Sequence, residues 1–250
     1  MPIETVTFES EVLGRTARMN VLVPDTGKSR YPTAYIHHGL SDTYETFFAR
    51  TDLAAHARDV EMIVVTPDGG TGWYCNDPRE GGLAWEDHIA TEVVQHVESA
   101  FPAMDTRRGR ALAGFSMGGY GAMMLALKHP NRFAAVCTHA GSFAFGHELR
   151  PDRPERSAFM QAVAPPGGEY DLYAITEELA ASGGTAMAIR FDVGVDDHLL
   201  EHNRTFHAHL ERLGIAHDYE EVPGGHEWST VNRQLPTTLS FLAAHLAEAR

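Results

Sequence analysis

Short apolar segments alternate with helix-length segments along most of the chain. In an α/β protein both faces of a parallel strand are buried, so such strands form nearly continuous apolar runs. The pattern predicts buried parallel strands at 33–37, 62–66, 110–115, 133–138, 186–193 and 218–222. Residues 3–10 and 15–23 instead mix β-branched and polar residues around Gly14, which predicts an antiparallel hairpin at a sheet edge.

Helical spacing of apolar residues between these strands predicts four helices, each with one apolar face toward the sheet. We expect Pro236 to kink or begin the last of them, because proline lacks a backbone N–H. Helices on both faces of a mostly parallel sheet make an α/β fold. The face residues are Ile89, Val93, Val97 and Phe101; Tyr120, Met123, Met124 and Leu127; Leu199, Phe206, Leu210 and Leu213; and Leu239, Leu242 and Leu246.

One segment, at about 142–184, interrupts the alternation. Two proline-rich stretches, RPDRP at 150–154 and PPGG at 165–168, break it into short helical pieces. We interpret it as a cap-like excursion over the C-terminal edge of the sheet. No repeat, low-complexity tract or linker divides the chain, so residues 1–250 are expected to form a single domain.

The charge balance excludes some partners. Lys and Arg number 20 and Asp and Glu 34, which gives a formal net charge of −14. Such a chain repels phosphate backbones and anionic lipids, so neither nucleic acid nor a membrane is expected as a partner. The first residues lack the basic and apolar parts of an export signal, which favours a cytoplasmic location with Cys75 and Cys137 reduced. The oligomeric state stays open, and a homo-oligomer is compatible with the sequence.

The strongest chemical motif is the run Gly114-Phe115-Ser116-Met117-Gly118, at the junction of a predicted strand and a predicted helix. A serine on such a sharp turn projects its hydroxyl into a cleft, and the flanking glycines avoid backbone clashes. This is the setting of a nucleophilic serine. The alternative is a glycine-rich start of a helix with an idle serine.

A nucleophilic serine needs a base and an acid that orients the base. In this type of fold both follow the nucleophile, on loops after late strands. Asp197 lies in the loop after the strand at 186–193, and His226 lies in a glycine-rich loop after the strand at 218–222. Asp197 is also a candidate helix N-cap, and the neighbouring Asp196 is the alternative acid.

The developing oxyanion needs backbone N–H donors, one after the nucleophile and one after an early strand. Met117 and Leu40 occupy those positions, with Gly39 allowing the turn or simply ending its strand. No metal is expected. The pairs His198 with His202 and His207 with His209 lack the carboxylate pattern of a zinc helix, and we interpret these histidines as surface residues.

Aromatic and apolar residues near the same sheet edge are candidates for the substrate pocket. Trp73 and Tyr74 follow a glycine-rich loop that starts at Pro67, which could equally be a plain surface turn. Four further candidates come from the excursion and could instead pack within it: Phe143, Phe145, Met160 and Tyr170.

From about Tyr35 to Phe241 the chain resembles the esterase D group of the α/β-hydrolases. The resemblance rests on HHGLSDTYETF, VVTPDGG, AGFSMGGYGAMMLALKHPNRFAA, YDLYAITEEL, GVDDHL and GGHEW, in that order. This group includes S-formylglutathione hydrolases, tributyrin-type carboxylesterases, feruloyl esterases, siderophore esterases and mycolyltransferases. The resemblance implies an α/β-hydrolase fold and the following roles: Ser116 as nucleophile, Asp197 as acid, His226 as base, and Leu40 and Met117 as oxyanion donors.

These observations favour a serine carboxylesterase that hydrolyses short-chain acyl esters of small molecules through an acyl-enzyme, without a cofactor. One alternative is an S-formylglutathione hydrolase, although the longer insertions associated with that group are not identifiable here. Another is an acyltransferase of the mycolyltransferase type, although those enzymes are exported. A non-catalytic binding protein is disfavoured because nucleophile, acid and base are all present.

Overall fold

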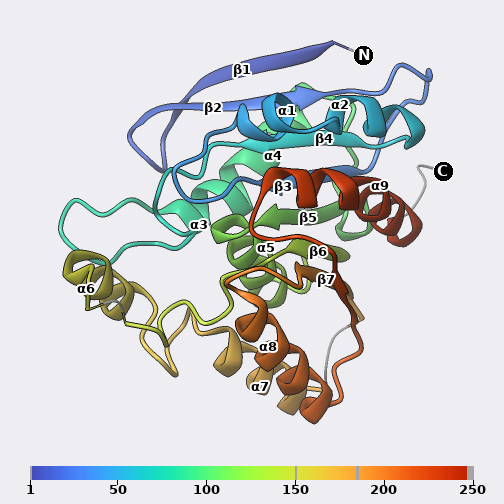
Figure 1. The fold of residues 1–250 in the computed structure, drawn as a ribbon. Coiled ribbons are helices and arrows are strands. Elements are labelled where there is room, and N and C mark those ends of the chain that lie inside the picture. Colours follow the sequence, from blue (N-terminus) through green and yellow to red (C-terminus); the bar gives the residue numbers. More distant parts are fainter. Residues whose placement is uncertain (1, 150, 184–185, 247–250) are drawn as a thin grey trace.

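The central feature of the fold is one β-sheet. The computed structural model describes residues 2–149, 151–183 and 186–246. In these ranges eight strands form the sheet, in the order β1-β2-β4-β3-β5-β6-β7-β8 (Figure 1). The strands are β1 (Ile3–Ser10), β2 (Arg15–Leu22), β3 (Thr33–His37), β4 (Ile63–Pro67), β5 (Arg110–Phe115), β6 (Ala135–His139), β7 (Ala188–Gly194) and β8 (Asp218–Val222).

Strand directions match the sequence pattern. β1 pairs with β2 and β2 with β4 in antiparallel register, whereas β3 to β8 pair in parallel. The predicted hairpin and the mostly parallel sheet are therefore confirmed, with strand ends shifted by at most two residues. Because the parallel strands point the same way, the loops after β3, β5, β7 and β8 meet at one edge.

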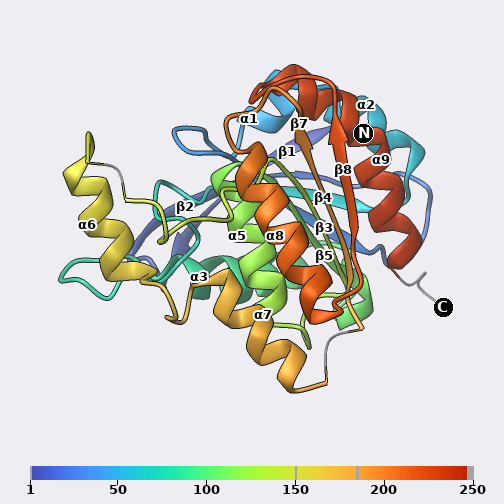
Figure 2. The ribbon, with the colours of Figure 1, turned by 60° about the horizontal axis from the view of Figure 1, so that its bottom comes forward.

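Helices cover both faces of the sheet, as Figure 2 shows nearly edge-on. One face carries α5, α7, α8 and the helix of residues 85–100, and the other carries α1, α2 and α9. The helices are α1 (Thr46–Arg50), α2 (Leu53–His56), η1 (Ala57–Asp59), α3 (Trp85–Asp87), η2 (His88–Val93), α4 (Val94–Ala100), η3 (Arg107–Gly109), α5 (Met117–Lys128), α6 (Pro154–Val163), α7 (Leu172–Ala181), α8 (Leu200–Leu213) and α9 (Trp228–His245).

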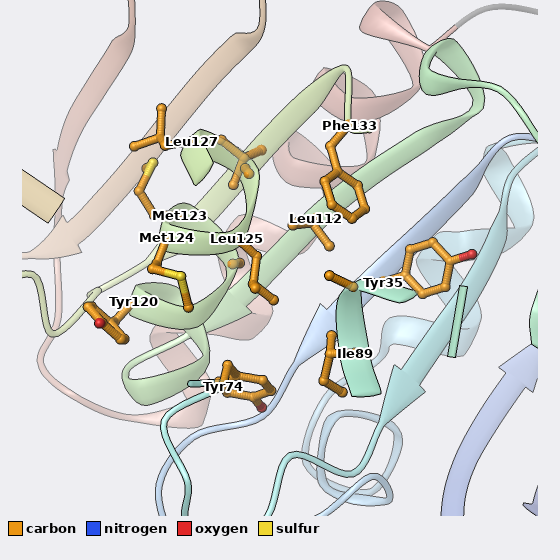
Figure 3. Packing of buried hydrophobic residues seen from close by; sticks show 14 of the residues in the cluster. Tyr35, Tyr74, Ile89, Leu112, Tyr120, Met123, Met124, Leu125, Leu127 and Phe133 are labelled. Atoms are coloured by element: carbon orange, nitrogen blue, oxygen red, sulfur yellow. The ribbon is translucent and has the colours of Figure 1, made fainter. Parts of the chain in front are cut away.

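Side chains of the strands alternate between the two faces. In β5, Leu112 joins the core beneath α5, whereas Ala111 and Ala113 join the core beneath α9. Figure 3 shows Leu112 near Leu125 of α5 and Ile89 of the helix beside it. Burial on both sides explains why the parallel strands are continuously apolar.

The helix α5 differs from the amphipathic helix that its sequence predicts, because every residue from Met117 to Leu127 is buried. Glycines allow this close packing. A Cβ on Gly118 would lie 2.2 Å from the backbone oxygen of His37, and one on Gly121 would lie 2.2 Å from the ring of Tyr74. The first turn of α5 therefore lies directly against the end of β3.

The last helix begins eight residues before Pro236, so the prediction that this proline begins the helix is wrong. The apolar face is continuous through Val231, Leu235, Leu239 and Leu242, all buried. Packing of this face outweighs the cost of a proline within a helix, about 3 kcal/mol. Phe101 likewise lies just beyond α4 rather than within it.

The segment 142–184 divides into two parts; residues 150 and 184 lie outside the described ranges. Its second helix, α7, belongs to the layer on the sheet, where it contacts α5 and α8. Its first helix, α6, projects from the body (Figures 1 and 2). Among the described helices, none combines the length and apolar content needed to cross a bilayer. Both cysteines are buried and free.

The contact of Gly118 gives a test of the fold. We expect Gly118→Ala to lower the free energy of unfolding by at least about 2 kcal/mol, because a backbone oxygen occupies the space of the new Cβ. Alanine would otherwise stabilise a helix by up to about 1 kcal/mol. Gly27→Ala is the control. A Cβ on Gly27 would have no heavy atom within 4 Å apart from its own chain neighbours, and the φ of +76° is expected to cost only about 1 kcal/mol of backbone strain. Urea unfolding of both variants measures the difference, and equal losses would contradict the close contact.

Candidate active site

Ser116 sits at the turn between β5 and α5 in a strained backbone conformation, with φ 58° and ψ −115°. Its N–H donates to the backbone oxygen of His139, 3.0 Å away, which fixes the turn to β6. Glycines are required on both sides, since a Cβ on Gly114 would lie 2.2 Å from the backbone oxygen of Gly118. The sequence motif thus forms the predicted turn, with the serine hydroxyl at the C-terminal edge of the sheet.

His226 lies between Ser116 and Asp197. With the proton on Nδ1, it donates to the Asp197 carboxylate at 2.9 and 3.1 Å, while Nε2 accepts from the Ser116 hydroxyl at 2.9 Å. The Asp197 carboxylate is fully buried and also accepts the N–H of Leu199 at 2.8 Å. Asp196 is exposed. The structure therefore brings Asp197, and not Asp196, to the histidine.

Backbone contacts hold the acid loop and the histidine loop together. The N–H of Val195 donates to the oxygen of Val222 at 2.9 Å, and the N–H of Asp196 donates to the oxygen of Gly224 at 2.9 Å. A Cβ on Gly194 would lie 2.2 Å from that same Gly224 oxygen. The two loops thus continue the pairing of β7 and β8 beyond the strands.

The backbone N–H of Met117 belongs to the first residue of α5, and that of Leu40 lies in the loop after β3 that borders the same cavity. Neither has a backbone acceptor within the described ranges. His38 fixes the first loop. Its Nδ1–H donates to the oxygen of Gly39 at 2.8 Å, and its Nε2 accepts from the N–H of Gly69 at 2.9 Å. His38 is therefore a structural residue of this loop.

A cavity of about 680 Å³ opens over Ser116. Of the predicted pocket residues, Trp73, Phe145 and Met160 line it, and Phe145 stacks on Trp73 with ring centroids 3.9 Å apart. Trp73 has a φ of 57°, so its backbone is strained where its indole borders the cavity.

The other predicted pocket residues do not line this cavity. The hydroxyl of Tyr74 donates to the backbone oxygen of His38 at 2.9 Å, so Tyr74 supports the loop of Leu40 from below. Phe143 packs against the rings of Phe191 and Phe206. Aromatic character alone cannot distinguish a cavity wall from a residue one layer deeper.

Tyr170 also lies away from the cavity, because its hydroxyl donates to the buried carboxylate of Glu86 at 2.7 Å. Lys128 and His129 donate to the same carboxylate, each at 2.7 Å. Burial raises the pKa of Glu86, but these three hydrogen bonds outweigh it and lower the pKa to about 2. The carboxylate thus connects Tyr170, between α6 and α7, to the end of α5.

Two cavity residues were assigned from sequence to the surface. His198 has an exposed side chain, and its ring lies 4.5 Å from that of His226. His202 lines the cavity and pairs with Glu148 at 3.0 Å. Possible ligand atoms of Asp197, His198 and His226 lie within 4.8 Å of one another, but two of these residues are engaged with each other and with Ser116. His198 is placed here as the neighbour of Asp197, and His202 by the first turn of α8, which follows the same loop.

A second set of similar groups is buried beneath the first. The Nδ1–H of His139 donates to Asp192 at 2.9 and 3.0 Å, and the Nε2 of His139 lies 3.1 Å from the Thr238 hydroxyl oxygen. All three residues are at most 2% exposed. They join β6, β7 and α9 just below the turn of Ser116.

Sequence comparison decides the family. The pattern of the Esterase family, described as "Putative esterase", matches residues 10–242. The chain belongs to the Esterase family. The esterase MT1326 of Mycobacterium tuberculosis is 30% identical over an alignment of 254 positions, which covers 88% of this chain and 54% of that protein. The chain thus spans about half the length of that relative.

Other relatives match over their full length. An acetyl esterase of Caldicellulosiruptor saccharolyticus is 23% identical, covering 97% of this chain and 98% of that protein. The structure of FphF, a fluorophosphonate-binding serine hydrolase of Staphylococcus aureus, superposes with a TM-score of 0.88 at 23% identity, covering 97% and 98% of the two chains. S-formylglutathione hydrolases and a ferulic acid esterase also share the architecture. The predicted α/β-hydrolase fold and esterase resemblance are confirmed.

The Glu86 network predicts a dependence of stability on pH. The pKa of Glu86 falls on folding from an ordinary 4.5 to about 2, so its contribution is complete above pH 4.5 and is lost as the pH falls toward 2. This contribution is on the order of 3 kcal/mol. We expect Glu86→Gln to lower Tm at pH 6 and to flatten the decline of Tm between pH 4.5 and about 2.5.

Glu177→Gln is the matched control, because Glu177 forms only an exposed pair with Arg212. Circular dichroism melts at each pH give the comparison. If Glu86→Gln follows the wild-type curve, the carboxylate does not carry the acid sensitivity.

Proposed function

We propose that this protein is a serine carboxylesterase with Ser116 as nucleophile, His226 as base and Asp197 as the orienting acid. The observation that carries the proposal is the continuous set of hydrogen bonds from the Ser116 hydroxyl through both nitrogens of His226 to a buried carboxylate. The family and the acetyl esterase relative support the same chemistry. No cofactor takes part in this scheme.

The reaction follows from the positions of these groups. The Ser116 oxygen attacks the ester carbonyl while His226 Nε2 takes the hydroxyl proton. The N–H groups of Leu40 and Met117 hold the oxyanion, and His226 then protonates the departing alcohol. Water attacks the resulting acyl-enzyme by the same route. Asp197 keeps the His226 proton on Nδ1, so that Nε2 is available as the base.

One wall of the cavity suits an apolar acyl group. Trp73, Phe145 and Met160 are each at most 3% exposed, so they border the space beside Ser116 as packed side chains. The acetyl esterase relative supports a short acyl group at this wall. Thioester hydrolysis is the second candidate, because S-formylglutathione hydrolases share the fold and the same attack would cleave a thioester.

Covalent labelling tests the nucleophile. A fluorophosphonate probe should label the wild type and fail to label Ser116→Ala, and hydrolysis of p-nitrophenyl acetate should fall about 10⁶-fold in kcat. Ser229→Ala, an exposed serine three residues beyond His226, should keep both activities. Turnover by Ser116→Ala near the wild-type rate would refute the assignment.

The two neighbouring aspartates test the acid. Asp197→Asn should lower kcat about 10⁴-fold, because an amide at this position favours the wrong tautomer of His226. Asp196→Asn removes the same charge from an exposed side chain and should change kcat by less than about threefold. Steady-state kinetics with p-nitrophenyl acetate compare them, and similar losses in the two variants would contradict the role of Asp197.

A further inference from the structure

A second cavity, of about 570 Å³, adjoins the cavity over Ser116. The two share three lining residues, Leu40, Trp73 and Arg156. The second cavity continues past Trp73 between the glycine-rich loop of residues 70–82 and the projecting helix α6. We call it the arginine pocket, because Arg15, Arg79 and Arg156 line it.

Each of these arginines lies over an aromatic ring. The guanidinium carbon is 4.9 Å from the ring centre of Trp85 for Arg15, 4.9 Å from that of Phe159 for Arg79, and 5.1 Å from that of Trp73 for Arg156. A guanidinium held flat on a ring keeps its N–H groups at its edge, where they can form paired hydrogen bonds to a carboxylate. The arginines are therefore preorganised for an anionic group.

The glycine-rich loop that lines this pocket packs closely against the indole ring of Trp85. A Cβ on Gly70 would lie 2.5 Å from the Trp85 ring, and one on Gly72 would lie 2.0 Å from it. Trp85 is 4% exposed, so the ring forms a buried floor beneath Arg15. The Trp85 ring is therefore held in place by close packing against the glycine-rich loop.

The charges in the pocket do not cancel. Three arginines face one acidic residue of the lining, Asp77, which binds Arg79 through two hydrogen bonds of 2.8 and 2.6 Å. Asp77 thus offsets the charge of Arg79, and the lining as a whole holds more arginine than acidic residues. The chain as a whole has a net charge of −14, so this local positive field opposes the overall charge.

Another part of the Ser116 cavity lining is acidic. Glu148 and Glu201 line it and also line the neighbouring cavity on that side. The Ser116 cavity therefore has acidic residues in one part of its lining and adjoins the arginine pocket at another. A negative charge on the substrate would favour the arginine pocket over the acidic part.

We propose that the arginine pocket binds a carboxylate of the substrate, so that the enzyme prefers esters carrying a negative charge away from the reacting carbonyl. Arg156 has the leading role because it lines both cavities, and Arg15 assists it. The proposal rests on the proposed esterase activity. The carboxylate can belong to the alcohol part or to the acyl part of the ester, and the two are distinguished by experiment.

Two matched pairs of substrates test the pocket. For the alcohol part, 4-acetoxyphenylacetate, which has a free carboxylate, is compared with methyl 4-acetoxyphenylacetate, which has none. For the acyl part, p-nitrophenyl hydrogen adipate is compared with methyl p-nitrophenyl adipate. The measured quantity is the kcat/KM ratio of the anionic to the neutral member. In at least one pair we expect this ratio to fall about tenfold in Arg156→Gln and also to fall in Arg15→Gln, because a charged hydrogen bond is lost.

Further variants separate charge from folding. Arg156→Lys should retain part of the preference, because the charge remains while the planar fork is lost. Arg108→Gln removes an exposed arginine at the N-terminal end of β5, the edge opposite Ser116, and should leave the ratio unchanged. Added salt should lower the wild-type ratio.

The outcomes distinguish the pocket from the esterase activity. If the wild type hydrolyses the neutral esters but neither Arg15→Gln nor Arg156→Gln changes the ratio in either pair, the arginine pocket is overturned and the esterase stands. If the wild type hydrolyses none of the four esters, the esterase proposal fails and the pocket proposal fails with it.

Discussion

The left-handed turn at Ser116 is the constraint on which the site depends. It requires glycine at positions 114 and 118. A Cβ on Gly114 would collide with the backbone oxygen of Gly118, and a Cβ on Gly118 would collide with that of His37. The same closeness presses the start of α5 against the end of β3. The contact of α5 with β3 therefore brings the Ser116 hydroxyl and the Met117 N–H to the loop of Leu40, which His38 and Tyr74 hold in place.

The remaining groups reach this turn through the order of the strands. β5 is followed in the sheet by β6, β7 and β8, so the loops that carry Asp197 and His226 leave the sheet beside each other. Their backbones are paired beyond the strand ends, up to Gly224. A stable parallel sheet thus fixes the distance between an imidazole and a hydroxyl that are 110 residues apart in sequence.

The sequence predicts those features that follow from local rules. Apolar runs locate the strands, and the glycine–serine motif and the order of acid and histidine locate the three central side chains. Features that depend on tertiary packing are not predictable in this way. The complete burial of α5, the early start of α9 and the different depths of Trp73 and Tyr74 depend on neighbours distant in sequence. Adjacent aromatic residues look alike in sequence, yet one borders a cavity and the other supports a loop.

The buried set of Thr238, His139 and Asp192 repeats the order of hydroxyl, imidazole and carboxylate found at the surface. Its consequence concerns what makes such an arrangement reactive. Where no ester or water can enter, the same three groups act as a clamp that ties two strands to a helix. The two sets therefore differ in access to solvent and to neighbouring free backbone N–H groups, and not in the order of their three side chains.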